Sequence, residues 1–243
     1  MANPRFYCPM PLPAEGLLTL PETVARHAVG ALRLNDGDAL VLFNGDGREH
    51  HGVLVRQGKH AQAHLIGVQS VERESPLDIT LVQGISTGER MDYTLQKSVE
   101  LGIRRILPVM MLRTVVRLDP DKRHKRRLHW QGVAASACEQ CGRNRLPEVL
   151  EIEDFSAWLA RTRHDASLRL ILDPGASRRL SQLAAPEQPA YLIAGPEGGI
   201  DPRERDAAIA AGCTPVSLGP RILRTETAAV AALAAMQGLW GDL

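Results

Sequence analysis

The most constraining feature of this sequence is an alternation of strand-like and helix-like segments that starts at Leu77 and continues to the end. Short apolar runs alternate with longer segments in which apolar residues recur at helical spacing. The expected strands cover residues 79–85, 103–110, 168–172, 191–194 and 215–218, and the expected helices 90–101, 120–138, 154–163, 202–211 and 225–239. Such alternation predicts an α/β domain with a largely parallel sheet.

The first 72 residues follow another pattern, in which short strand-like runs are separated by turn sequences. The expected strands cover 5–7, 39–43, 52–56 and 61–68, with a short helix at 21–29. Asn35-Asp36-Gly37 and the run from Asn44 to Gly47 are typical of tight turns and hairpins. These features predict a small β-barrel or barrel-like sheet. A polar, proline-terminated stretch at 71–76 then marks the boundary, giving domains 1–72 and 73–243.

The charges balance overall but are unevenly distributed. Lys and Arg number 29 against 28 Asp and Glu, so the net charge of +1 does not by itself indicate a charged partner. Eleven basic residues lie between Arg104 and Arg145, nine of them up to Arg127 and the last two at Arg143 and Arg145. Only three acidic residues lie in the same stretch. Local cationic surface is typical of phosphate binding, and RNA is the favoured partner. A solvated helix face explains residues 122–127 equally well. Aromatic residues, at 4%, are too few for a protein that coats single strands.

The cysteines and apolar runs point to a reducing compartment and no membrane span. Four cysteines in 243 residues do not make a disulfide framework. The first residues lack the apolar run of a signal peptide, and the longest apolar stretch, 228–236, is far too short to span a bilayer. We therefore expect a soluble, cytoplasmic protein. Cys138 and Cys141 have metal-like spacing, but no second ligand pair matches them and they end a helix, so no metal or redox role is expected.

Three glycine- and proline-containing loops follow expected strands. They are Leu172-Asp173-Pro174-Gly175, Gly195-Pro196-Glu197-Gly198-Gly199 and Leu218-Gly219-Pro220-Arg221. Glycine lets the backbone approach a ligand closely, and open α/β sheets bind ligands beyond the carboxyl ends of their strands. Turn chemistry alone explains any one loop, whereas three in one sheet favour a binding site. Neither the dinucleotide-binding nor the P-loop glycine pattern is present.

The sequence GPEGG at 195–199, together with LGPRILRTETAA at 218–229, closely resembles the ribosomal RNA small subunit methyltransferase E family, within the SPOUT class of knotted methyltransferases. The resemblance extends to residues 27–38, 83–103 and 137–149, with Ala31 in place of a larger aliphatic residue as one departure. It implies an α/β domain with a trefoil knot, an N-terminal PUA-like RNA-binding barrel and a homodimer. It also implies methyl transfer from S-adenosylmethionine to N3 of a uridine in 16S rRNA of the small subunit.

The resemblance also implies roles for individual residues. The cofactor pocket is expected to include Leu172, Gly195, Glu197, Gly198, Leu218, Gly219, Ile222 and Leu223. Arg224 is expected to stabilise the uracil anion or orient the RNA, and Glu197 to act as base or as partner of the sulfonium. Because phosphate contacts set affinity and register while few groups touch the target base, we also expect a continuous cationic surface for RNA that joins Arg5 and Arg33 to Arg143, Arg145 and Arg224.

Three questions stay open at this stage. The alanine-rich helix at 225–239 has small residues at helical spacing, which suits a dimer interface or packing within one chain. A non-catalytic ribosome-assembly factor would keep the same fold and basic surface, although intact loops at 195–199 and 218–224 argue against it. A related enzyme acting on transfer RNA is the other alternative, which the N-terminal barrel and the Gly-Arg-Asn-Arg segment disfavour.

Overall fold

The computed structural model describes residues 3–57 and 60–243, which form two compact units. The first unit comprises the chain up to Glu74 together with Ala135–Leu146. The second comprises Ser75–Ala134 and Pro147–Leu243. The division expected from the sequence placed residues 135–146 in the second domain, whereas they pack with the first. No helix in the described ranges is long and apolar enough to cross a membrane.

The first unit is built on a five-stranded sheet with the order β1-β3-β4-β5-β2. Its strands are β1 (Arg5–Tyr7), β2 (Gly16–Thr19), β3 (Ala39–Phe43), β4 (Arg48–Gln57) and β5 (His60–Ser70). β1 pairs with β3 in parallel and the other pairs are antiparallel. Among the described residues no strand pairing joins β1 to β2, so backbone hydrogen bonds do not close the sheet into a ring.

A helical segment covers the core of this sheet. It consists of α1 (Glu22–Ala25) followed by a π-helical turn, η1 (Arg26–Ala31), where a single helix over 21–29 was expected. Apolar side chains from the strands and from this segment share one core, including Phe6, Val24 and Leu54. β2 was missed from the sequence because Leu17 and Leu18 are flanked by Gly16 and by prolines, which read as loop.

A buried carboxylate joins four parts of the first unit. Glu49 on β4 is 5% exposed and accepts hydrogen bonds from Arg5 at 2.6 Å, Arg73 at 2.5 Å and Asn144 at 3.3 Å. Asn144 also accepts a 2.6 Å hydrogen bond from Arg5. Burial alone would raise the pKa of Glu49, but these donors outweigh it and hold the pKa below its ordinary value. The network therefore holds residues 142–146 against the N-terminal sheet.

The second unit contains a parallel sheet with the strand order β12-β10-β11-β6-β7-β8, and β9 also pairs with β7. Its strands are β6 (Ile79–Gly84), β7 (Arg105–Met110), β8 (Glu148–Val149), β9 (Glu153–Asp154), β10 (Leu168–Leu172), β11 (Ala190–Ala194) and β12 (Thr214–Val216). Every pair is parallel, which confirms the predicted fold class. The two-residue strands β8 and β9 are too short to show periodicity and were missed. The trefoil knot stays a prediction.

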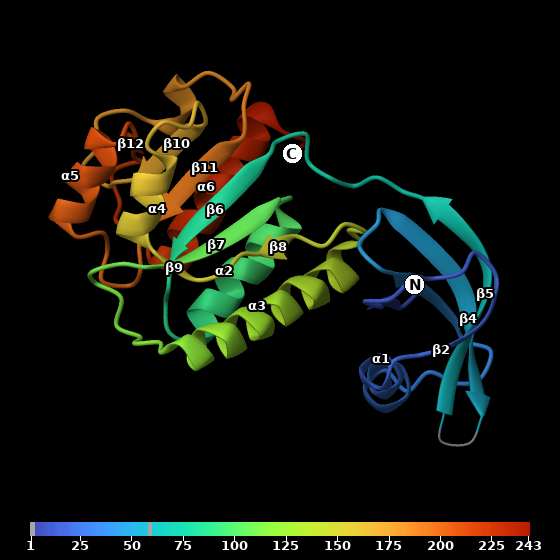
Figure 1. The fold of residues 1–243 in the computed structure, drawn as a ribbon. Coiled ribbons are helices and arrows are strands. Elements are labelled where there is room, and N and C mark those ends of the chain that lie inside the picture. The colour runs from blue at the N-terminus through green and yellow to red at the C-terminus, as the bar shows by residue number, and fades with distance from the viewer. Residues whose placement is uncertain (1–2, 58–59) are drawn as a thin grey trace. The chain divides into compact units, whose positions relative to one another are not determined.

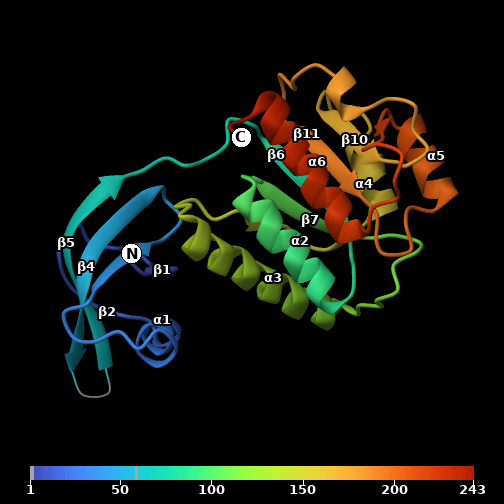
Figure 2. The same cartoon turned by 180° about the vertical axis from the view of Figure 1, so that it is seen from behind.

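Helices cover both faces of this sheet. α2 (Gly88–Glu100) and α6 (Thr225–Trp240) lie on one face, in front in Figure 2. α4 (Phe155–Thr162) and α5 (Pro202–Ala210) lie on the other, in front in Figure 1. The remaining helices are α3 (Pro120–Cys141) and the short 3₁₀ turn η2 (Leu180–Gln182). As expected, Asp201 caps α5 by accepting a hydrogen bond from the Arg203 backbone N–H at 3.1 Å, with Pro202 at the first helical position.

We predict that Glu49→Gln destabilises the first unit by about 2–4 kcal/mol, because it leaves two guanidinium groups short of their buried counter-charge. Native-state hydrogen exchange over residues 39–70 measures this loss. Folding lowers the pKa of Glu49 from 4.5, so the contribution of Glu49 to stability is present above that pH and is lost as the pH falls through its native pKa.

The control is Glu72→Gln, whose side chain is 58% exposed and pairs with Arg145. It should cost less than about 1 kcal/mol, and equal losses in the two variants would contradict this assignment.

Candidate functional site

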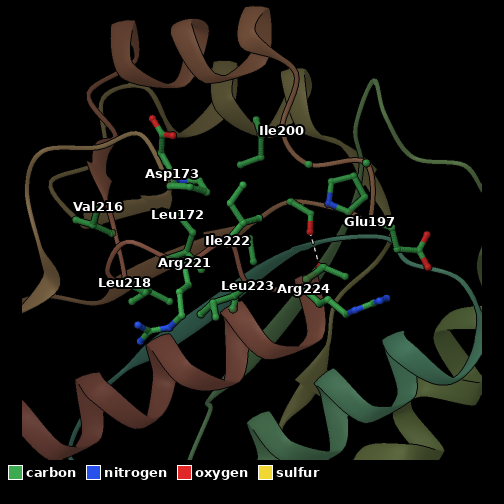
Figure 3. Close-up of a pocket in the computed structure, with 18 of the residues that line it drawn as sticks. Leu172, Asp173, Glu197, Ile200, Val216, Leu218, Arg221, Ile222, Leu223 and Arg224 are labelled. Atoms are coloured by element: carbon green, nitrogen blue, oxygen red, sulfur yellow. Dashed lines mark hydrogen bonds between the residues drawn. The ribbon is translucent and has the colours of Figure 1, made fainter.

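Three loops of the second unit enclose a cavity of about 320 Å³. They follow β10, β11 and β12, which are adjacent in the sheet and parallel, so their carboxyl ends meet at one edge. The lining residues are 172–174, 194–200, 216, 218–219, 221–225 and 228 (Figure 3). This is the edge at which the sequence predicted a ligand site.

The residues that the sequence predicts to bind the cofactor all line this cavity. The cavity is lined by Leu172, Gly195, Glu197, Gly198, Leu218, Gly219, Ile222, Leu223 and also by Arg224. Because these positions come from three separate loops, their convergence depends on the strand order. The strand order could not be derived from the strand positions alone.

The loop at 195–199 is tied to the start of α6. The carbonyl oxygen of Gly195 accepts hydrogen bonds from Thr225 Oγ1 at 2.6 Å and from Gln83 Nε2 at 3.3 Å. The fully buried Gln83, on β6, also donates to Thr225 Oγ1 at 3.1 Å. A Cβ atom at Gly195 would lie 2.6 Å from Cγ1 of Ile200, so the loop closes on itself only because this residue is glycine.

Apolar side chains form one side of the cavity. Leu172, Val216 and Leu223 belong to this side, and Ile222 lies at the mouth with 87% of its surface exposed. An isoleucine this exposed beside a cavity offers apolar area that a bound ring would cover. Gly219 nearby has φ +113°, a conformation that a side chain would strain.

Glu197 contributes to the cavity wall, but its carboxylate turns toward α2 (Figure 3). Oε1 accepts hydrogen bonds from the Thr87 backbone N–H at 3.1 Å, from Thr87 Oγ1 at 2.5 Å and from Arg90 at 2.7 Å. Burial alone would raise the pKa of Glu197, but the donors on Thr87 and Arg90 outweigh it and hold the pKa below its ordinary value. The group is therefore ionised at neutral pH and anchors the 195–199 loop to the start of α2.

Two arginines on the 218–224 loop leave their charges available. Arg221 and Arg224 are both exposed, and within residues 3–57 and 60–243 neither guanidinium has an ion pair or hydrogen bond. Arg224 immediately precedes α6, and Figure 3 shows its guanidinium on the same side as Glu197, with Arg221 directed toward Leu218. A cation without a carboxylate partner at a cavity mouth can stabilise negative charge on a ligand.

Sequence reasoning missed several residues that build this site. Asp173 and Thr225 line the cavity, and Gln83, Thr87 and Arg90 hold its loops. Asp173 carried a signal, because it is a polar residue directly after an expected strand. Gln83 carried a weaker one, since it is the amide at the end of an otherwise apolar strand. Thr87 and Arg90 lie in the 83–103 stretch of the resemblance, but no local pattern indicated their partner, which lies about 110 positions away in the chain.

The four arginines predicted to contact RNA have different environments. Arg143 is buried and pairs with Glu74, and the part-buried Arg5 pairs with Glu49, so both have structural roles. The side chain of Arg145 is 47% exposed and pairs with Glu72. Arg33 is exposed and adopts a left-handed φ of 55°. The RNA contacts of these residues stay predictions, and the burial of Arg5 and Arg143 argues against theirs.

The Cys138–Cys141 pair lies at the end of α3, as expected. Burial raises the pKa of the Cys138 thiol to about 12, so it is protonated at neutral pH. Among the residues with described positions, no group of three or more His, Cys, Asp or Glu side chains could hold a metal ion.

Comparison with known families identifies both parts of the chain. Residues 73–237 match the RNA methyltransferase domain, and residues 20–66 match the RNA methyltransferase PUA domain. These matches confirm an α/β methyltransferase domain preceded by a PUA-type domain.

Individual relatives are similar over nearly the whole length. The ribosomal RNA small subunit methyltransferase E of Buchnera aphidicola from Schizaphis graminum is 33% identical, covering 99% of this chain and 98% of that protein. The Bacillus subtilis protein of that name is 32% identical, covering 86% of this chain and 85% of its own. The crystal structure of the Neisseria gonorrhoeae protein of the same name, bound to S-adenosyl methionine, is 41% identical with a TM-score of 0.91, covering 100% of both chains. A structure from Legionella pneumophila with bound SAM is 38% identical with a TM-score of 0.94, again over 100% of both. The chain belongs to the ribosomal RNA small subunit methyltransferase E family.

Proposed function

We propose that the cavity formed by residues 172–174, 195–200 and 216–225 binds S-adenosylmethionine, and that the protein methylates N3 of a uridine in 16S rRNA of the small ribosomal subunit. The observation that carries this proposal is the convergence of the two sequences that mark the family, 195–199 and 218–225, on one cavity. Two similar proteins were solved with this cofactor bound.

The residues of the cavity fit such a cofactor. Its volume of about 320 Å³ lies at the lower end of the range for small-molecule sites. Ile222 and Leu223 offer apolar surface to the adenine ring, and Gly195, Gly198 and Gly219 leave backbone groups accessible to the polar atoms of adenosine. When bound, the cofactor supplies an electrophilic methyl group attached to a sulfonium.

Arg224 has the geometry for the chemical step. N3 of uridine carries a proton and becomes nucleophilic as that proton leaves, so negative charge develops on the uracil ring. The Arg224 guanidinium stands at the cavity mouth without a carboxylate partner in the described structure, and it can stabilise this charge. Holding the uracil against the methyl group supplies a further part of the acceleration.

Glu197 is better suited to positioning than to proton transfer. A carboxylate with a lowered pKa is a weak base, and general-base catalysis is most effective when the pKa lies near the working pH. Its hydrogen bonds to Thr87 and Arg90 instead fix the loop that carries Gly195 and Gly198. The roles of base and of sulfonium partner stay predictions.

The working unit in this proposal is a cytoplasmic homodimer. Ala229, Ala232, Leu233 and Met236 bury one face of α6 within the chain. Ala228, Ala231 and Ala235 are only partly buried, and Leu239 is 47% exposed, which leaves small residues available for a second copy. Sedimentation at micromolar concentration tests this, and a species of only 26.5 kDa would contradict it.

The overall proposal is tested on small subunits isolated from a strain that lacks this enzyme. Incubation with the purified protein and S-adenosylmethionine should produce 3-methyluridine in 16S rRNA, detected by nucleoside mass spectrometry. A product found in transfer RNA and not in subunits would favour the alternative substrate. Cofactor binding without any methylated RNA would favour an assembly factor.

We predict that Gly195→Ala weakens cofactor binding at least about tenfold, because the new methyl group would displace Ile200 and the carbonyl that Thr225 holds. Isothermal titration with S-adenosylmethionine measures the affinity. Gly238→Ala is the matched control, since a Cβ on this residue of α6 meets nothing within 4 Å and the change favours the helix. Wild-type affinity in the Gly195 variant would remove this loop from the site.

We predict that Arg224→Gln lowers the single-turnover methylation rate by about 10²–10³, the loss typical of removing a donor to a developing anion. The affinities for S-adenosylmethionine and for the small subunit should each change by less than about threefold, because the side chain acts mainly in the transition state. Filter binding and titration measure these affinities. A variant with an unchanged rate and weakened RNA binding would reassign Arg224 to docking.

We predict that Glu197→Gln lowers the methylation rate by a constant factor at every pH from neutral to mildly alkaline. With Glu197 already ionised over this range, the rate of both proteins should rise in parallel as the uridine N3–H ionises. Single-turnover rates on small subunits give the two profiles. If the wild-type methylation rate does not change with pH and only the rate of the variant rises in proportion to hydroxide concentration, Glu197 is the base.

A further inference from the structure

The amino-terminal half of α3 and the loop before it carry two kinds of cation. One kind pairs with nearby carboxylates, namely Lys122, Arg123 and Arg127. The other kind is exposed and has no ion pair or hydrogen bond in the described parts of the chain, namely Arg117, Lys125 and Arg126. We call this second set the cationic entrance. Its members can bind phosphate without first giving up a carboxylate, which makes them the stronger candidates for contact with nucleic acid.

Arg126 connects the cationic entrance to the start of α2. It lines a small cavity together with Ser86 and Gly88. These residues flank Thr87, whose backbone N–H and hydroxyl bind Glu197 in the wall of the large cavity. Arg126 is therefore separated from the methyl-transfer site by the width of a single loop.

The loop that carries Arg117 makes a second, independent connection. Arg113 donates a 3.3 Å hydrogen bond to the carbonyl oxygen of Gly198, and a Cβ at Gly198 would lie 3.1 Å from Cβ of Arg113. The loop thus begins against the wall of the large cavity. Arg117 follows four residues later, which limits it to within about 14 Å of that wall along the chain.

From these contacts we infer that RNA flanking the target uridine binds through its phosphates to the cationic entrance of the methyltransferase unit, at Arg117, Lys125 and Arg126. This inference rests on the proposed function and specifies how its substrate docks. It selects three cations that are unpaired in the described structure from the basic stretch 104–145, whereas Arg5 and Arg143, which the sequence also predicted to contact RNA, pair with Glu49 and Glu74. Phosphate contacts here set the register in which the uracil reaches Arg224.

The test compares Arg117→Gln/Arg126→Gln with Arg163→Gln. Arg163 is a matched control because it is exposed and its guanidinium has no ion pair in the described ranges. It lies between α4 and β10, at the amino ends of the parallel strands, whereas the cavity lies beyond their carboxyl ends. Filter binding to isolated small subunits at 50, 100 and 200 mM salt gives the affinity and its salt dependence for each protein.

The double variant should bind subunits more weakly, with a log–log salt slope reduced by about 1.4–1.8 for two lost phosphate contacts. Its titration with S-adenosylmethionine should match the wild type, because neither Arg117 nor Arg126 lines the large cavity. A double variant that behaves like Arg163→Gln overturns the inference. Weaker binding with an unchanged salt slope also overturns it and assigns the surface to a protein of the subunit. Failure of the wild type to methylate subunits would instead refute the proposed function itself.

Discussion

The parallel pairing of β10 with β11 and β12 is the constraint on which the rest of the site depends. In this order the carboxyl ends of three strands that are distant in sequence lie at one edge of the sheet. The loops that follow must then share one space, and they do so as the wall of one cavity. Hydrogen bonds from Thr225 and Gln83 to the Gly195 carbonyl fix two of these loops relative to each other. The pocket is thus shaped by backbone geometry, with few charged groups inside it.

Much of this arrangement could be predicted because its signals are local. The strand at 168–172 and the caps of α5 agree with the structure to the residue or nearly so, since a short apolar run and an Asp-Pro pair act within one element. The pocket residues were found because their loops carry a distinctive family sequence. The position of the site at the carboxyl edge followed from a general property of parallel sheets.

What sequence could not provide was the choice of partner for each charge. Arg5 and Arg143 were predicted to contact RNA, yet each pairs with a carboxylate of the same unit that lies far away in the sequence. Glu197 was predicted as a base or sulfonium partner, and the sequence did not indicate that Thr87 and Arg90 donate hydrogen bonds to its Oε1 atom. Such pairings depend on which loops the fold brings within about 3 Å, and this is set by long-range packing rather than by any local pattern.

The distribution of these pairings gives the two units different electrostatic characters. In the first unit, Glu49 and Glu74 neutralise the arginines that would otherwise form a basic surface near residues 142–145. In the second unit, Glu197 is directed onto Arg90, which leaves Arg221 and Arg224 at the cavity mouth without a carboxylate in the described structure. A polyanionic substrate is attracted most strongly where cations are unpaired, because an existing ion pair must be broken before it can contribute. The same pairing that stabilises the first unit therefore removes Arg5 and Arg143 from the available positive charge, whereas Arg221 and Arg224 keep theirs beside the cavity.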